Sequence, residues 1–434
     1  MLLARPLVLS LLWPKNNRVA LQLASRYGFD IAGLCGLFNP AEIEHVRKTG
    51  ARYYDLGGAE VPKDPELFEH VRARVESVKE PLMRAVAGDG TQLRKRIAGA
   101  MLTAIGEEAY SAFYFTDLFD RLHGQNAVAL VLLNEAETVL GKTAAQWGRK
   151  HGIPVCVISH GANLPNAYTV TRETANVDFL MVFGERGAEP YLDRKFPAER
   201  IFVTGNPAWD SMPTWLARRD QIRAQVFEQC HFDKSRPVVM LATTWDSNLS
   251  ALNDGRGYER TLRSFCAAGK ILEKRGLPVN LVVKDRPTND THGQSKSKAI
   301  AEQLELDAYH YVTGDLATFL TAADVMVGHE SSAFVEAMLF GVPAINLWTP
   351  LTWIAGPALE REDGIPLIRW DAPDALADVI TALLNDKRVK AELVSAMQSR
   401  LPRFHVANDG NSARRCADAA ASIIGVRAPI ERAS

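Results

Sequence analysis

Four consecutive polar residues interrupt an apolar stretch near position 330, and their types suit the binding of a phosphate group. His329, Ser331 and Ser332 lie between a short apolar run and a segment with helical spacing over residues 333–340. The first amides of a helix lack partners and carry the positive end of its dipole, so a helix that starts at these serines offers an anion site. Glu336 follows one turn later, where an ionised carboxylate could accept hydrogen bonds from ribose hydroxyls.

The same residues also fit a purely structural role. Serine is a common N-cap residue, and a glutamate in the first turn of a helix is often simply solvated. The spacing of Ser331, Ser332 and Glu336 is compatible with either interpretation.

Two cations and a histidine stand at the ends of two other apolar runs. Lys284 and Arg286 follow a run over 279–284, and His160 follows a run over 155–159. If these runs are parallel strands, the three side chains lie at the carboxyl edge of a sheet, where ligands bind. Two cations there could neutralise a departing diphosphate, and an imidazole could accept the proton of an attacking hydroxyl. Alternatively, the cations are loop charges and the histidine is structural.

Apolar runs alternate with helical patterns along most of the chain, which is typical of βαβ units in parallel sheets. We predict strands over 7–12, 29–34, 52–56, 127–133, 155–159, 179–183, 201–204, 237–243, 279–284, 324–328 and 344–348. We predict helices over 18–26, 42–48, 65–121 with a break near 88–90, 138–151, 187–194, 219–229, 258–275, 316–323, 333–340, 375–384, 389–397 and 413–424.

The length of 434 residues exceeds one compact core and favours two domains. The patterns divide the chain into 1–212, 213–404 and a final turn and helix over 405–434 that packs back toward the first domain, with 210–220 as connector. The fold class is therefore α/β, with two Rossmann-like, doubly wound parallel sheets. A formal net charge of −1 gives no footprint for nucleic acid.

Composition and missing motifs narrow the function further. The five cysteines are scattered and never form a CxxC pair, which argues against disulfides and a zinc site and for a reducing, cytoplasmic location. Residues 1–13 are apolar but too short to span a bilayer, and we expect a first buried strand there and no signal peptide. We find no P-loop, no GxGxxG after the first strand, no GxSxG, no HExxH and no Asp-x-Asp, so we expect no bound metal.

A basic amphipathic segment suggests a possible partner. Residues 92–105 place Arg94, Lys95 and Arg96 beside apolar positions. Such a segment is either a solvated surface helix or a peripheral contact with the inner face of a membrane.

Several short segments resemble GT-B enzymes. HESSAFVE followed by Gly-Val-Pro resembles their donor-nucleotide site, and KDRP resembles the K-x-H-P of CDP-glycerol glycerophosphotransferases, with Arg286 replacing the histidine. ISHGANLPN resembles the W-H-G-T-P segment of those transferases and the Q-H-G segment of capsular polysaccharide enzymes. NDGNS resembles the transferases' D-G-x-x-S, and TGNPAWD resembles the T-G-N-x-x-x-D of UDP-N-acetylglucosamine 2-epimerases. Physically, Gly205 and Pro207 also form a turn there, with Asp210 capping the connector.

The resemblance implies two domains facing across a cleft and a metal-independent glycosyltransferase of surface or capsular glycan synthesis. Its co-substrate would be a nucleotide-activated sugar, with no other cofactor, and its acceptor a glycan or lipid-linked hydroxyl. The second domain would hold the donor, and the first would bring the acceptor, with His160 as general base. The diphosphate would contact His329, Ser331, Ser332, Lys284 and Arg286, and the ribose Glu336.

Two other functions remain open from the sequence. TGNPAWD favours a 2-epimerase, but the first loop lacks G-T-R-P-E and the turn at 329–332 lacks D-S-G-G. A non-catalytic nucleotide-binding protein would keep the binding residues without turnover.

Overall fold

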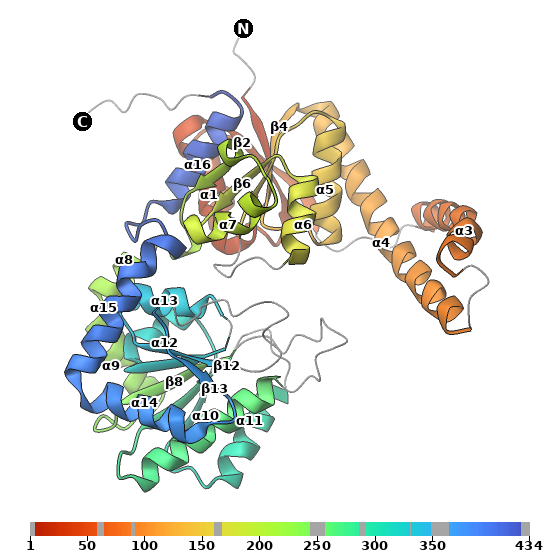
Figure 1. The fold of residues 1–434 in the computed structure, drawn as a ribbon. Helices are drawn as coiled ribbons and strands as arrows, with labels where there is room; N and C mark the ends of the chain where they lie inside the picture. Colours follow the sequence, from red (N-terminus) through yellow and green to blue (C-terminus); the bar gives the residue numbers. More distant parts are fainter. Residues whose placement is uncertain are drawn as a thin grey trace, which may run out of the picture.

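The computed structural model describes residues 5–58, 65–87, 92–159, 167–243, 257–285, 292–329, 331–348 and 364–426. They form two α/β domains, each built on one parallel sheet with helices on both faces (Figure 1). Because both faces of each sheet are covered, the strands are apolar almost throughout, and every residue of Leu7–Leu11 and Val238–Ala242 is buried.

The first domain has a seven-stranded sheet in the order β3-β2-β1-β4-β5-β6-β7, with every pair parallel. The strands are β1 (Leu7–Leu11), β2 (Asp30–Cys35), β3 (Tyr53–Gly58), β4 (Val128–Leu133), β5 (Val155–Ile158), β6 (Phe179–Val182) and β7 (Ile201–Val203). The helices are α1 (Arg18–Tyr27), α2 (Pro40–Lys48), α3 (Pro65–Ala87), α4 (Gln92–Gln125), α5 (Val139–Lys150), α6 (Ala167–Asn176) and α7 (Glu185–Asp193).

The second domain has a six-stranded parallel sheet in the order β10-β9-β8-β11-β12-β13. The strands are β8 (Val238–Ala242), β9 (Asn280–Lys284), β10 (Tyr309–Val312), β11 (Val325–Gly328), β12 (Ala344–Trp348) and β13 (Leu367–Arg369). The helices are α9 (Arg219–Gln229), α10 (Gly257–Lys274), α11 (His292–Gln303), α12 (Leu316–Ala322), α13 (Ala333–Phe340), α14 (Pro373–Asn385) and α15 (Lys387–Phe404).

Most predicted elements are present, but several were missed. The missed elements are α6, α11, β10, β13 and a short helix in the connector, α8 (Met212–Ala217). Their patterns are weak: β10 is half-buried along its whole length, and β13 has only three residues. A strand of this kind is held by its neighbour in the sheet, which a sequence window does not contain.

The chain crosses between the domains twice. After α15 it returns to the first domain and ends in α16 (Ser412–Ile423), which packs on α1 and buries Cys416, Ala417 and Ala420 beside Val8 and Leu12. The two crossings are adjacent, because the backbone N–H of Asn206 in the first crossing donates to Nδ1 of His405 in the second at 3.2 Å.

A long helical pair between β3 and β4 projects from the first domain (Figure 1). The C-terminal half of α4 is anchored, since Phe115, Phe119 and Leu122 are buried in the core. We call α3 together with residues 92–111 of α4 the helical arm. Its two helices run antiparallel: Val75 lies opposite Gly106, and the rings of Phe68 and Tyr110 are 5.8 Å apart.

Candidate functional site

Each sheet has one switch point, the position between two neighbouring strands from which the later strands are added in opposite directions. In the first sheet this point lies between β1 and β4, and in the second it lies between β8 and β11. Loops that leave the carboxyl ends of such strands diverge and form a crevice for ligands. The loop after β1 carries Lys15, and the turn after β11 carries His329, Ser331 and Ser332.

The side chain of Asn134, which follows β4, links the strand ends at the first switch point. Its side-chain oxygen accepts the N–H of Trp13 at 2.5 Å, and its amide nitrogen donates to the carbonyl oxygen of Ile158 at 2.8 Å. The buried amide thereby links the carboxyl ends of β1, β4 and β5. It fixes the start of the loop that presents Lys15.

The turn between β11 and α13 is compact because Gly328 has no side chain. A Cβ there would lie 3.0 Å from the ring of Phe334, which packs directly over the strand end. At the other end of α13, Gly341 has φ +63° and closes the helix. These two glycines seat a short, nearly fully buried helix against the sheet, with its N-terminus at the switch point.

The serines at this turn do not leave the helix amides as open as predicted. The hydroxyl of Ser331 accepts the N–H of Ala333 at 3.2 Å, while Phe334 and Val335 donate to the carbonyl oxygens of Ser331 and Ser332. The prediction of several unpaired amides is therefore wrong for these three groups, because a tight first turn satisfies them locally. The helix dipole and both hydroxyls remain at the turn.

His329 is oriented by the neighbouring strand. Its Nδ1 lies 2.9 Å from the carbonyl oxygen of Leu347 on β12. A carbonyl oxygen only accepts, so Nδ1 carries the proton and Nε2 is left as the other polar atom of the ring. Burial lowers the pKa of His329, with the bond to Leu347 opposing that shift, so the imidazole is neutral at pH 7.

Lys284 ends β9, as predicted, and its side chain is only 7% exposed on a residue basis. Burial lowers the pKa of its ammonium, and the carboxylates of Glu336 and Asp315 act in the opposite direction. A buried cation at a strand's carboxyl end can interact strongly with a bound anion because little water screens it, and the two carboxylates partly offset that attraction.

Glu336 is half-buried at the start of α13, within the electrostatic reach of groups from both domains. Burial raises the pKa of its carboxyl to about 7, and Lys15 and Lys284 partly offset this effect. The indole N–H of Trp209 lowers the pKa of this carboxyl as well, as a nearby donor does. Lys15 lies in the first domain, Trp209 just before the connector and Lys284 in the second domain, so groups from three separate segments act on Glu336.

Lys15 and Trp209 were not among the predicted site residues. Lys15 lies in a 3-10 turn (Pro14–Asn16), and Trp209 ends another (Pro207–Trp209); the two turns pack on each other. The position of Lys15 in the sequence could have predicted its role. It follows the first strand of a predicted doubly wound sheet, where a cation faces the crevice. The convergence with Glu336 depends on how the domains face each other, which spacing does not encode.

Asp285 was also not predicted, and its hydrogen bonds link several elements at the end of β9. The carboxylate is fully buried and accepts hydroxyls of Thr243, Tyr258 and Tyr311, the tyrosines at 3.0 and 2.6 Å. A Cβ on Gly293 would approach the same carboxylate to 2.5 Å, so α11 also begins against it. Asp285 thereby ties together the carboxyl ends of β8, β9 and β10 next to Lys284.

The other predicted residues either lie outside the described residues or have structural roles. His160 and Arg286 lie outside the described residues. In TGNPAWD, Gly205 has φ +83°, as a turn requires. Asp210 does not cap the connector: its carboxylate accepts the N–H groups of Ser412 and Ala413, both at 2.8 Å, and thus caps α16. That correction follows from the return of the chain, which brings α16 to the connector.

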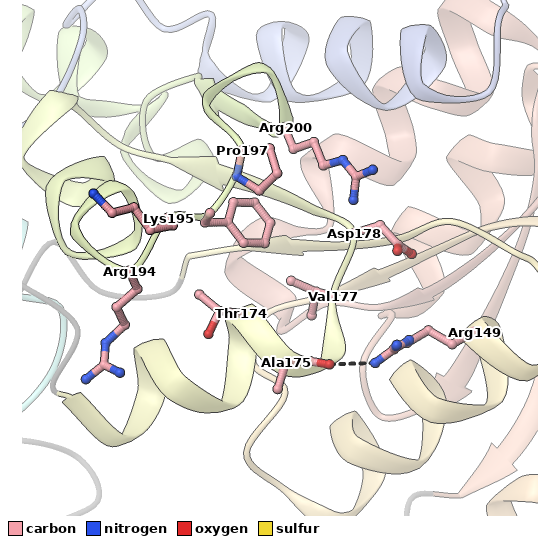
Figure 2. A pocket seen from close by; sticks show the side chains of 10 residues that line it. Arg149, Thr174, Ala175, Val177, Asp178, Arg194, Lys195, Pro197 and Arg200 are labelled. Carbon is pink, nitrogen blue, oxygen red and sulfur yellow. Dashed lines mark hydrogen bonds between the residues drawn. The ribbon is translucent and has the colours of Figure 1, made fainter.

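A separate hollow of about 260 Å³ lies in the first domain (Figure 2). It opens at the amino ends of β5, β6 and β7, the edge of the sheet opposite the switch point. Arg194 and Lys195 extend in different directions from its rim, and Arg149 is engaged with the carbonyl oxygen of Ala175. The C-terminal ends of α5, α6 and α7 surround it, so cations there complement helix dipoles and do not converge on one anion.

Within the described ranges, no group of three or more His, Cys, Asp or Glu residues could hold a metal ion. No helix among the described residues is long and apolar enough to cross a membrane.

Two facing domains of parallel sheet, each with its switch point at the carboxyl edge, define the GT-B fold, and the predicted fold class is confirmed. The chain is similar to a UDP-N-acetylglucosamine 2-epimerase (14% identity, TM-score 0.60, 99% of this chain and 100% of the other). It also resembles the UDP-GlcNAc 2-epimerase of Neisseria meningitidis bound to UDP-GlcNAc (12% identity, TM-score 0.57, 95% and 99%).

A third similar structure is the wall teichoic acid polymerase TagF soaked with CDPG (13% identity, TM-score 0.53, 96% of this chain and 88% of the other). No family model matches the chain, and no curated protein matches it by sequence. The structural likeness therefore establishes the fold that transferases and epimerases share, and it leaves the reaction to be argued from the site.

Proposed function

We propose that the protein is a metal-independent glycosyltransferase that moves a sugar, or a related activated group, from a nucleotide donor to a hydroxyl acceptor. The observation that carries this proposal is that Lys15, Lys284 and Glu336 lie at or beyond the carboxyl ends of strands in the two sheets, and that both lysines act on the pKa of the Glu336 carboxyl. Two cations from different domains suit a diphosphate, and a carboxylate between them and the helix start suits a ribose.

The roles follow from the chemistry of each group. Lys284 and Arg286 neutralise the diphosphate as it leaves, with Ser331, Ser332 and the α13 dipole, and His329 presents its second ring nitrogen to the same turn. His160 takes the proton of the acceptor hydroxyl while the acceptor oxygen bonds to the anomeric carbon and the bond to the diphosphate breaks. Charge stabilisation at the leaving group is the larger catalytic effect, and the base adds roughly a hundredfold or more.

The co-substrate is a nucleotide-activated sugar, and the reaction needs no other cofactor. The acceptor is a glycan or lipid-linked hydroxyl in surface or capsular glycan synthesis on the cytoplasmic side of a membrane. The first domain brings this acceptor to the carboxyl ends of β4 and β5, and the second holds the donor at β9 and α13.

A thermal-shift panel of UDP-, CDP-, GDP- and CMP-linked donors tests the proposal first. A ligand that binds only the folded state raises the melting temperature, by an amount that grows with its concentration relative to Kd. We expect one nucleotide class to raise it. Glu336→Ala should lose that shift, whereas Glu302→Ala, on the exposed face of α11, should keep it. No shift with any donor would refute a nucleotide site.

The reaction itself is tested with His160→Ala. We expect transfer to be lost while the donor still raises the melting temperature; full transfer in this variant would remove the base assignment. Incubating the wild-type protein with a UDP-sugar and no acceptor distinguishes an epimerase, because only an epimerase converts the sugar under those conditions. Donor binding without turnover for any acceptor would identify a binding protein.

A further inference from the structure

The helical arm separates its charges along its length. Its distal part, residues 79–87 and 92–96, carries five cations (Lys79, Arg84, Arg94, Lys95 and Arg96) and one acid (Glu80). The remainder, 65–78 and 97–111, carries five acids (Glu66, Glu69, Glu76, Glu107 and Glu108) and two cations (Arg72 and Arg74). One end is therefore net positive and the other net negative, in a chain whose overall charge is close to zero.

The positive end lies far from the packed core. Phe115 is buried in the first domain, and α4 begins at Gln92, so at 1.5 Å per residue the arm reaches roughly 30 Å beyond its anchor. Figure 1 shows α3 and the start of α4 standing clear of both sheets. A surface that contacts this end needs no access to the crevice between the domains.

Apolar side chains accompany the cations. Met101 and Ile105 are 49% and 42% exposed, and they lie one turn apart on the same face of α4. Arg96 and Arg84 are exposed on the two helices nearer the distal end. Exposed apolar residues next to basic residues on a helix are the composition of segments that lie in the headgroup region of anionic membranes.

We propose that the distal end of the helical arm binds an anionic lipid surface. Anionic lipids attract cations near the surface, whereas the acidic part of the arm is repelled, so the arm meets the surface by its distal end. Met101 and Ile105 then insert shallowly beside the headgroups. A second copy of the chain is a poorer occupant, because a stable interface buries about 800 Å² per partner and two apolar side chains supply little of that area. This inference does not depend on the proposed transferase activity.

Co-sedimentation of the full chain with lipid vesicles tests the proposal. We expect binding to vesicles made of equal parts phosphatidylcholine and phosphatidylglycerol, little binding to phosphatidylcholine alone, and weaker binding as salt is raised. The double variant Arg84→Glu/Arg96→Glu should lower the partition coefficient at least roughly tenfold. Met101→Ser/Ile105→Ser should lower it with a smaller change in salt dependence.

The matched control is Lys298→Glu/Arg388→Glu, which reverses two exposed cations on helices of the second domain. It should bind the vesicles like the wild type, and circular dichroism should show that every variant is folded. Equal binding to neutral and anionic vesicles, or none to either, would overturn the proposal. So would a dimer in sedimentation equilibrium that Met101→Ser/Ile105→Ser dissociates, since the occupant would then be a second copy.

Discussion

At the scale of single residues, the central feature is the carboxyl group of Glu336, whose raised pKa lies close to neutral pH. The pKa of Glu336 is raised to about 7 by burial, against the opposing charges of Lys15 and Lys284. An acceptor for ribose hydroxyls must be ionised, because only the carboxylate offers all its lone pairs. Donor binding should therefore be linked to the loss of a proton from Glu336.

We expect the affinity for the preferred nucleotide to fall as the pH drops below about 7, by up to roughly tenfold per pH unit. Titration calorimetry on wild type and Glu336→Gln at several pH values measures this effect. The glutamine variant controls for titration of the nucleotide's own phosphate, since it should bind weakly and with a flatter pH profile. Parallel profiles in the two proteins would exclude Glu336 as the linked group.

The same pKa shift has a defined sign for stability. An acid whose pKa is raised by folding costs the fold nothing below its ordinary pKa, near 4.5, and costs progressively more as the pH rises toward 7. Ligand-free Glu336→Gln should therefore be more stable than wild type at alkaline pH by about 2 kcal/mol and should lose that advantage in acid. Urea unfolding at the two extremes gives the difference.

Lys15 provides a second test at this scale, because it lies in the domain that does not carry the predicted donor residues. Lys15→Ala should weaken nucleotide binding by about tenfold if its ammonium meets the diphosphate. The control is Lys48→Ala, an exposed lysine on α2 of the same domain. Calorimetry should find the control unchanged, and equal affinity in all three proteins would remove Lys15 from the site.

At the scale of elements, the return of the chain to the first domain depends on one carboxylate. Asp210 accepts two backbone N–H groups at the start of α16, and Arg415 of that helix donates to the carbonyl oxygen of Thr204 at 2.8 Å. The α16 N-terminus has no cap from its own Asn411 side chain. The connector therefore caps a helix about 200 residues away in the sequence.

Asp210→Ala should lower the free energy of unfolding by about 1–2 kcal/mol, because two helix amides lose a charged acceptor. Asp374→Ala, in the exposed first turn of α14, is the comparison and should change it by less than about 0.5 kcal/mol. Denaturant unfolding measures both. An equal effect of the two substitutions would show that the cap adds nothing to stability.

At the scale of the whole molecule, His405 lies where the two crossings between the domains meet. Its Nδ1 accepts the N–H of Asn206 at 3.2 Å, and its ring packs on Trp209, whose indole N–H lowers the pKa of Glu336. Burial lowers the pKa of His405 to about 4, the charge of Arg415 adds to the shift and Asp409 opposes it. Protonation would break the bond to Asn206.

A base whose pKa is depressed by folding costs stability as the pH falls below its ordinary pKa of about 6.5 toward 4. We expect wild type to lose about 2 kcal/mol more than His405→Gln between roughly pH 7 and pH 5. Thermal or urea unfolding at both values checks this, and the comparison of the two proteins cancels other titrating groups. The same loss in both would assign the acid sensitivity elsewhere.

Local chemistry along the chain was enough to predict the fold class and most of the elements. Apolar runs of five or six residues could only be strands buried on both faces, and Gly341 with Pro343 fixed the end of α13, so the α/β class and most elements followed from periodicity. The predicted strand ends were close enough to the observed ones to place Lys284 at the end of β9 and His329 in the turn after β11. Weak elements such as β13 escaped, because a neighbouring strand, and not their own pattern, holds them.

Tertiary structure decided everything that depends on two distant segments meeting. It set Lys15, Trp209 and Lys284 around Glu336, gave the amides of α13 local partners, and made Asp210 the cap of α16. The physical reason is range: helix and strand periodicity reflects interactions between near neighbours in the chain. The electrostatics of this site instead arise between Glu336 and groups that lie about 50 to more than 300 residues away in the sequence.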